Sequence, residues 1–93
     1  MEIEEGILHT VPEDIRAVLL SNEALLEKWN KLTPIMRNEW ICWTTIVKQE
    51  ITRKEHIQRL QEDILDGKKR PCCWQGCPHR NEKARKYFKN LID

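Results

Sequence analysis

Three cysteines and a histidine lie within eight residues near the C-terminus: Cys72, Cys73, Cys77 and His79. Thiolate and imidazole are the preferred protein ligands of zinc, and the gap between Cys73 and Cys77 falls within the usual ligand spacing. The spacing therefore makes Cys73, Cys77 and His79 candidate zinc ligands, with Cys72 as an additional candidate. Gly76 would allow the loop to turn tightly around an ion.

A closed tetrahedral zinc site needs a fourth ligand, which Cys72, Cys42 or His56 would have to supply. The main alternative is that reduced Cys73 and Trp74 simply pack on the protein as soft hydrophobic groups. If these residues only pack, no cofactor is expected. If the thiols and imidazole bind a metal, the expected cofactor is zinc.

A redox pair is a further interpretation of the adjacent residues Cys72 and Cys73. Nearby positive charge from Lys69, Arg70 and Arg80 would favour the thiolate form that such chemistry requires. The cysteine cluster is the only sequence feature that would favour an enzymatic activity.

Charge is distributed unevenly along the chain, although its formal net charge is only +1. Residues 1–32 hold seven acids and three bases, a charge of −4, whereas residues 68–89 hold eight bases and one acid, a charge of +7. Such a basic arm is typical of a solvated tail or of a surface for phosphates or acidic proteins. Its candidate contact residues are Lys68, Lys69, Arg70, Arg80, Lys83, Arg85 and Lys86.

The other residues capable of chemistry have simpler explanations. Cys42 lies between Trp40 and Trp43 and is expected to be buried filler, and His9 and His56 are expected on the exposed surface. Neither histidine has a serine or cysteine at a spacing that suggests a nucleophile and its base. We therefore expect no catalytic residues and no enzyme.

Helix signals recur along the chain. Capping boxes at Thr10 and Thr52, a cap at Ser21 or Asn22, and the pair Thr33-Pro34 predict four helix starts. The predicted helices cover about residues 11–20, 22–31, a longest one from 34, and 53–66, where Gly67 ends the last. A further helix is predicted over residues 81–91.

Apolar residues recur with helical spacing in each predicted helix, and no stretch alternates as a strand would. The sequence therefore predicts an all-α fold: a small bundle of four short amphipathic helices, followed by a Cys-rich loop and a C-terminal helix. The expected inward residues are Ile15, Val18, Leu19, Leu25, Leu26, Trp29, Met36, Trp40, Trp43, Val47, Ile57, Leu60 and Ile64.

A chain of 93 residues fits one small domain. We divide it into an extension (1–9), a helical domain (10–67) and a basic Cys-containing arm with a helix (68–93). No run is apolar enough to span a bilayer, and the acidic N-terminus does not resemble a secretory signal. The expected location is the cytoplasm, where disulfides are uncommon.

Several motifs recur in a characteristic order and spacing between residues 10 and 69: Val11-Pro12-Glu13-Asp14-Ile15, Asn22-Glu23-Ala24, Trp29, Leu32, Arg37-Asn38-Glu39-Trp40, Trp43, Lys48, Thr52-Arg53 and Gly67-Lys68. In these motifs the chain resembles the bacteriocin-protection family called YdeI or OmpD-associated. The chain departs from the family in having almost nothing before this module, and in Lys54-Glu55-His56, where an arginine-rich turn is more usual.

The resemblance implies a helical module, often found behind a β-rich domain, with a role in resistance to antimicrobial peptides and no catalytic residue. We therefore expect an interaction module for an unidentified protein or peptide, with no membrane partner. Its acidic first third would attract cationic peptides. The alternative is zinc-dependent or nucleic-acid recognition through the basic arm. The oligomeric state does not follow from the sequence.

Overall fold

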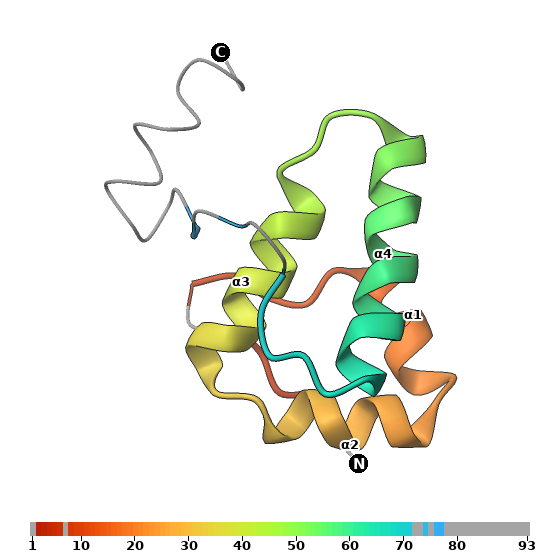
Figure 1. Cartoon of the computed structure of the whole chain (residues 1–93), viewed down its shortest axis with the longest axis vertical. Coiled ribbons are helices and arrows are strands. Elements are labelled where there is room, and N and C mark those ends of the chain that lie inside the picture. The colour runs from red at the N-terminus through yellow and green to blue at the C-terminus, as the bar shows by residue number, and fades with distance from the viewer. Residues whose placement is uncertain (1, 7, 72–73, 75, 78–93) are drawn as a thin grey trace.

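The computed structural model describes residues 2–6, 8–71, 74 and 76–77, and within them it contains four α-helices and no strand. The helices are α1 (Glu13–Leu20), α2 (Glu23–Lys31), α3 (Pro34–Thr45) and α4 (Glu50–Leu65). The all-α prediction is confirmed, and the helix predicted over residues 81–91 lies outside the described residues. Helix α2 lies across the ends of α3 and α4 (Figure 1), packing on α1 and α4, while α3 packs on α4.

Two predicted helix starts are confirmed by their side-chain caps. The Asn22 side chain accepts from the backbone N–H of Leu25 at 3.1 Å, which begins α2. The Thr33 hydroxyl accepts from the N–H of Met36 at 3.2 Å, and Pro34 occupies the first position of α3. Each cap satisfies an N–H that the helix itself leaves without a partner.

Two predicted capping boxes are wrong. Helix α1 begins after Pro12, and no side chain caps it. Helix α4 begins at Glu50, so Thr52 lies inside the helix. The prediction that the helix from Pro34 is the longest is also wrong: α3 has 12 residues and α4 has 16. Helix α3 ends at Thr45, whose hydroxyl donates to the carbonyl of Ile41 at 2.8 Å, a local bond that competes with helix continuation.

The core is built from the apolar faces of all four helices. The inward residues predicted for α2 and α4 are buried, and in α1 Ile15 and Leu19 are fully buried while Val18 is half-buried. Burying such a side chain contributes roughly 1.5–3 kcal/mol. In α3 the prediction holds only for Trp40, since Met36 and Trp43 are half-buried and Val47 lies beyond the helix.

Polar residues occupy much of the buried surface of α3. Arg37, Asn38, Glu39 and Thr44 are each at most 6% exposed. Buried polar groups normally have hydrogen-bond partners, and Arg37, Asn38 and Glu39 each bind a segment far away in the sequence. The Thr44 hydroxyl has no hydrogen-bond partner among the described residues.

The end of α4 directs the chain back over the bundle. Gly67, at φ +95°, donates to the carbonyl of Ile64 at 3.0 Å, and Lys68 donates to that of Asp63 at 2.9 Å. This pair of bonds is a Schellman motif, which confirms Gly67 as the stop. The following segment then passes α3 and α4 (Figure 1). Among the described residues, no helix has both the length and the apolar character needed to cross a bilayer.

Candidate functional site

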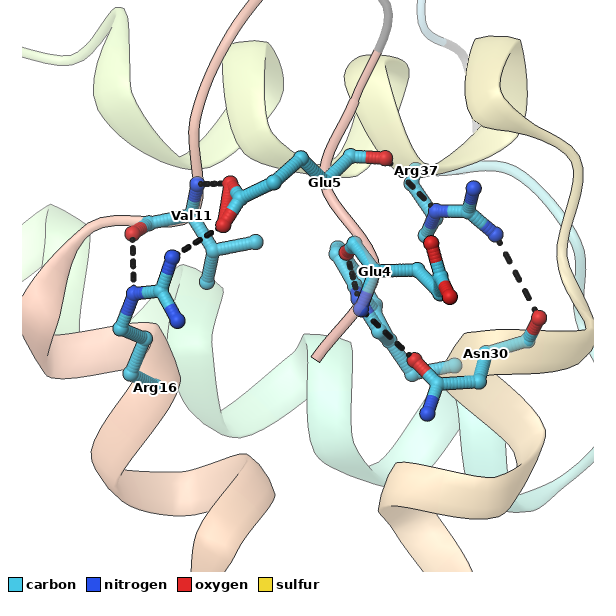
Figure 2. A network of polar contacts seen from close by, with 7 residues as sticks. Glu4, Glu5, Val11, Arg16, Asn30 and Arg37 are labelled. Carbon is cyan, nitrogen blue, oxygen red and sulfur yellow. Dashed lines mark hydrogen bonds and ion pairs between the residues drawn. The ribbon is translucent and has the colours of Figure 1, made fainter. Parts of the chain in front are cut away.

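The N-terminal segment, defined as the described residues from 2 to 12, is bound to α2 and α3 by a polar network (Figure 2). The indole Nε1 of Trp29 donates to the Glu4 carbonyl at 2.8 Å, and the Glu4 N–H donates to the Asn30 side chain at 2.9 Å. Arg37 donates through Nε to the Glu5 carbonyl at 2.8 Å and through its terminal nitrogen to the Leu32 carbonyl. The segment is thereby part of the folded domain.

The Glu5 side chain, and not that of Thr10, contacts the chain around the start of α1. Its carboxylate accepts from the N–H of Val11 at 2.6 Å and forms an ion pair with Arg16 on α1 (Figure 2). An acidic group near a helix N-terminus also interacts favourably with the helix dipole. The start of α1 is therefore fixed by a residue eight positions upstream of Glu13, which a local capping rule does not detect.

Asn38 on α3 determines where His9 lies. Its side-chain oxygen accepts from the backbone N–H groups of Leu8 and His9, at 3.0 and 2.9 Å, and the residue is fully buried. Gly6 approaches the same point so closely that a Cβ there would meet the Asn38 Cα at 2.8 Å. His9 is thereby held against α3 at Asn38, which lies one helical turn before Cys42.

The C-terminal segment, defined as the described residues from 66 to 77, is also bound to α3. The indole Nε1 of Trp40 donates to the Lys69 carbonyl at 3.0 Å, and that of Trp74 donates to the Glu39 carboxylate at 3.3 Å. Gly76 has φ +106°, a conformation that favours glycine. Cys77, the next residue, is completely buried.

These contacts bring together three side chains from distant parts of the sequence: His9, Cys42 and Cys77. Their ligand atoms all lie within 4.8 Å of one another, and His9 Nε2 is 3.3 Å from Cys77 Sγ. Both cysteines are buried and His9 is half-buried. Burial raises the pKa of the Cys42 thiol, as do its contact with Cys77 and the negative charge of Glu39.

The structure places the predicted site residues differently from the sequence pattern. Cys77 lies in the cluster, whereas Cys72, Cys73 and His79 lie outside the described residues. Cys42, expected as filler, is buried but sits beside two further ligand-type groups.

The prediction that both histidines are exposed surface is wrong. His9 is half-buried in the cluster. His56 is also half-buried, because its ring stacks on Trp43 with centroids 3.9 Å apart. His56 Nδ1 lies 3.0 Å from the Trp43 carbonyl, so it does not join the cysteines.

A second feature is a shallow depression of about 150 Å³ between α2 and the end of α4. Leu32 and Ile64 contribute apolar surface, and four lysines line it: Lys28, Lys31, Lys68 and Lys69. Lys68 also lies 3.5 Å from the Asp63 carboxylate. The structure thus joins two lysines of the predicted basic arm to two lysines of the supposedly acidic first third.

The remaining charged residues complete this description. Arg70 is exposed, and Arg80, Lys83, Arg85 and Lys86 lie outside the described residues. In the acidic first third, Glu5 is paired with Arg16, and Asp14 is paired with Arg53 at 2.7 Å. Part of the predicted negative surface is therefore neutralised within the molecule.

Comparison with protein families decides the identity of the module. Residues 9–67, more than half of the chain, match the family described as bacteriocin-protection, YdeI or OmpD-associated. The chain belongs to this family. The resemblance found in the helical motifs is thus confirmed, and the match includes His9 and Cys42 but ends before Cys77. Comparisons with curated proteins and with solved structures give no match.

Sequence reasoning missed His9, Asn38 and Glu39 as parts of a site. A signal was present in α3, where Asn38 and Cys42 are four residues apart and share a helix face with neighbouring Glu39. A run of polar residues in a helix flanked by tryptophans indicates that the polar groups have buried partners. It does not indicate which segments supply them.

Proposed function

We propose that this YdeI/OmpD-associated protein is a binding module and not an enzyme, and that it holds an acidic segment of another protein or a peptide. The observation that carries this proposal is the depression in which Lys28, Lys31, Lys68 and Lys69 surround apolar surface. The family description, bacteriocin protection, supports a role in resistance to bacteriocins. In that role the module acts by holding a partner protein in the cytoplasm.

The chemistry of the depression favours an acidic amphipathic ligand. Lysine ammonium groups attract carboxylates, while half-buried Leu32 and the methylene stems of the lysines offer contact to an apolar side chain between them. Among the described residues, those that line this depression include no aromatic side chain on which a nucleic-acid base could stack. The attraction is between exposed charges and must weaken as salt increases.

Fluorescence anisotropy with a labelled peptide of glutamate and leucine residues tests the proposal. We expect salt-sensitive binding that weakens about tenfold, or ~1.4 kcal/mol, when Lys31→Glu and Lys69→Glu are combined. Lys48→Glu combined with Lys54→Glu is the matched control, because it makes the same change in net charge and both lysines are exposed outside the depression. Equal affinities of the Lys31/Lys69 variant and this control would contradict the proposal.

A nucleic acid is the second candidate ligand, favoured by the gathering of four lysines on one surface. A labelled single-stranded DNA and a cationic antimicrobial peptide therefore serve as comparison probes in the same titration. Binding of the DNA with no binding of the acidic peptide would replace the proposal with phosphate recognition. Binding of the cationic peptide alone would return the function to the acidic first third.

A further inference from the structure

The buried polar face of α3 is organised around the cluster of His9, Cys42 and Cys77. Asn38 binds the segment that carries His9, and Glu39 binds Trp74, three residues before Cys77. Asn38 and Glu39 lie four and three positions before Cys42, so all three residues share one side of the helix. The buried polar groups of α3 thus position two chain segments against a single cysteine.

The dimensions of the cluster fit a tetrahedral zinc ion. Zinc binds sulfur at about 2.3 Å and imidazole nitrogen at about 2.0–2.1 Å, which separates sulfur and nitrogen ligands by roughly 3.5 Å in a tetrahedron. The observed distance of 3.3 Å between His9 Nε2 and Cys77 Sγ is close to that separation. With all three ligand atoms within 4.8 Å of one another, only small movements would be needed to bind an ion.

The charge environment favours a cation at this point. Glu39 is 2% exposed and lies three positions before Cys42 on the same side of α3, where its carboxylate attracts a divalent cation. Zinc with two thiolates is neutral, so binding also removes the difficulty of burying those charges.

We propose that His9, Cys42 and Cys77 bind a zinc ion that joins the N-terminal segment, α3 and the C-terminal segment. This set shares Cys77 with the ligands predicted from sequence spacing, and Cys42 with the residues considered for the fourth ligand. His9 and Cys42 lie 68 and 35 positions before Cys77, separations that no local motif describes. A fourth ligand completes the tetrahedron, and the proposal commits to the three named here.

Zinc content and cobalt spectra of the full chain test this site without reference to any ligand of the lysine depression. Untagged protein, purified under reducing conditions from zinc-supplemented medium, is expected to contain about one zinc per chain by elemental mass spectrometry. Cobalt substitution is expected to give the intense absorption bands of a tetrahedral site with thiolate ligands.

Single variants identify the ligands. Cys42→Ser, Cys77→Ser and His9→Gln are each expected to lower zinc affinity at least tenfold in a competition with a chromophoric chelator. His56→Gln is the matched control, since His56 stacks on Trp43 outside the cluster, and it should keep wild-type affinity. Circular dichroism of each variant shows whether the helices remain. If a variant is unfolded, the cobalt spectrum of the wild type still tests the proposal.

Three results would overturn the proposal. Wild-type protein that contains no zinc and gives no tetrahedral cobalt spectrum excludes the site. Full zinc binding by both Cys42→Ser and His9→Gln assigns the metal to the cysteine-rich loop alone. A metal-free wild type in which peptide mapping under non-reducing conditions finds a disulfide between Cys42 and Cys77 shows a covalent bond in place of the zinc site.

Discussion

The N-terminal segment is bound to α2 and α3 and the C-terminal segment to α3, and the two are held by different kinds of contact. A buried arginine, two asparagine side chains and the Trp29 indole hold the N-terminal segment by hydrogen bonds. The C-terminal segment has two indole bonds, from Trp40 and Trp74, and then the thiol of Cys77 in the cluster.

The difference indicates how each segment should respond to conditions. Hydrogen bonds from arginine and amide groups are the same in reducing and oxidising solution, and they need no ion. Thiol and imidazole groups change with oxidation, metal and pH. We therefore expect the attachment made through Glu4 and Glu5 to be constant, and the attachment made through His9 and Cys77 to be adjustable.

The largest expected effect comes from breaking the constant attachment at Arg37. Arg37→Met keeps much of the side-chain volume but leaves the carbonyls of Glu5 and Leu32 without this donor. We expect the free energy of unfolding in urea to fall by about 3 kcal/mol, and equally with and without a metal chelator. Arg59→Met, at an exposed position of α4, should change it by less than about 0.5 kcal/mol. A loss at Arg37 no larger than the control would contradict this role.

An intermediate effect is expected from the two tryptophans that bind the segments: Trp29 binds the N-terminal segment and Trp40 binds the C-terminal segment. Trp29→Phe and Trp40→Phe each remove a fully buried indole and are each expected to destabilise the fold by about 2 kcal/mol. Only Trp40→Phe removes the bond to the Lys69 carbonyl, so trypsin should cleave after Lys69 faster in that variant alone. Mass spectrometry of limited digests, under conditions where both variants are folded, measures the difference. Equal cleavage would mean that the indole bond does not restrain the segment.

The smallest effect is expected from the ion pair between Asp14 on α1 and Arg53 on α4, which contacts neither segment. The Arg53 guanidinium lowers the pKa of Asp14 below its ordinary value of 3.8, so the pair stabilises the protein above about pH 4 and is lost as pH falls through the lowered pKa. Because both side chains are partly exposed, Asp14→Asn should cost about 0.5 kcal/mol at neutral pH.

Urea titrations between pH 2 and 7 measure this contribution, which should be absent from the variant. Glu55→Gln, at an exposed position of α4, is the control for loss of one negative charge. If the variant and wild type differ equally at pH 2 and pH 7, the ion pair is not the cause.

The extent to which this fold follows from sequence differs from helix to helix. Helices α2 and α4 follow the 3.6-residue period because one face of each is apolar, and Asn22 caps α2 through a purely local bond. Helix α3 does not, since its polar residues are buried against segments far away in the chain. Glu5 contacts Val11 and Arg16 around the start of α1 for the same reason: its partners are set by tertiary structure.

The candidate site was harder to predict than the fold. The cysteine-rich loop identified Cys77 by local spacing, but the structure places it with His9 and Cys42. Their proximity depends on bonds made by Asn38, Glu39 and Trp40 to backbone or side-chain groups about 30 positions away. Spacing rules describe ligands that share a loop, and they contain no information about contacts of this length.

The contact between His9 and Cys77 spans 68 positions of the chain, and all four helices lie between them. A bond through an ion at this contact would close that stretch into a ring. In the loop-closure treatment, closing a ring of this size removes enough conformational entropy from the unfolded chain to stabilise the fold by roughly 4 kcal/mol. An ion that touches only one helix would therefore restrain all four, by limiting how far the unfolded chain can expand.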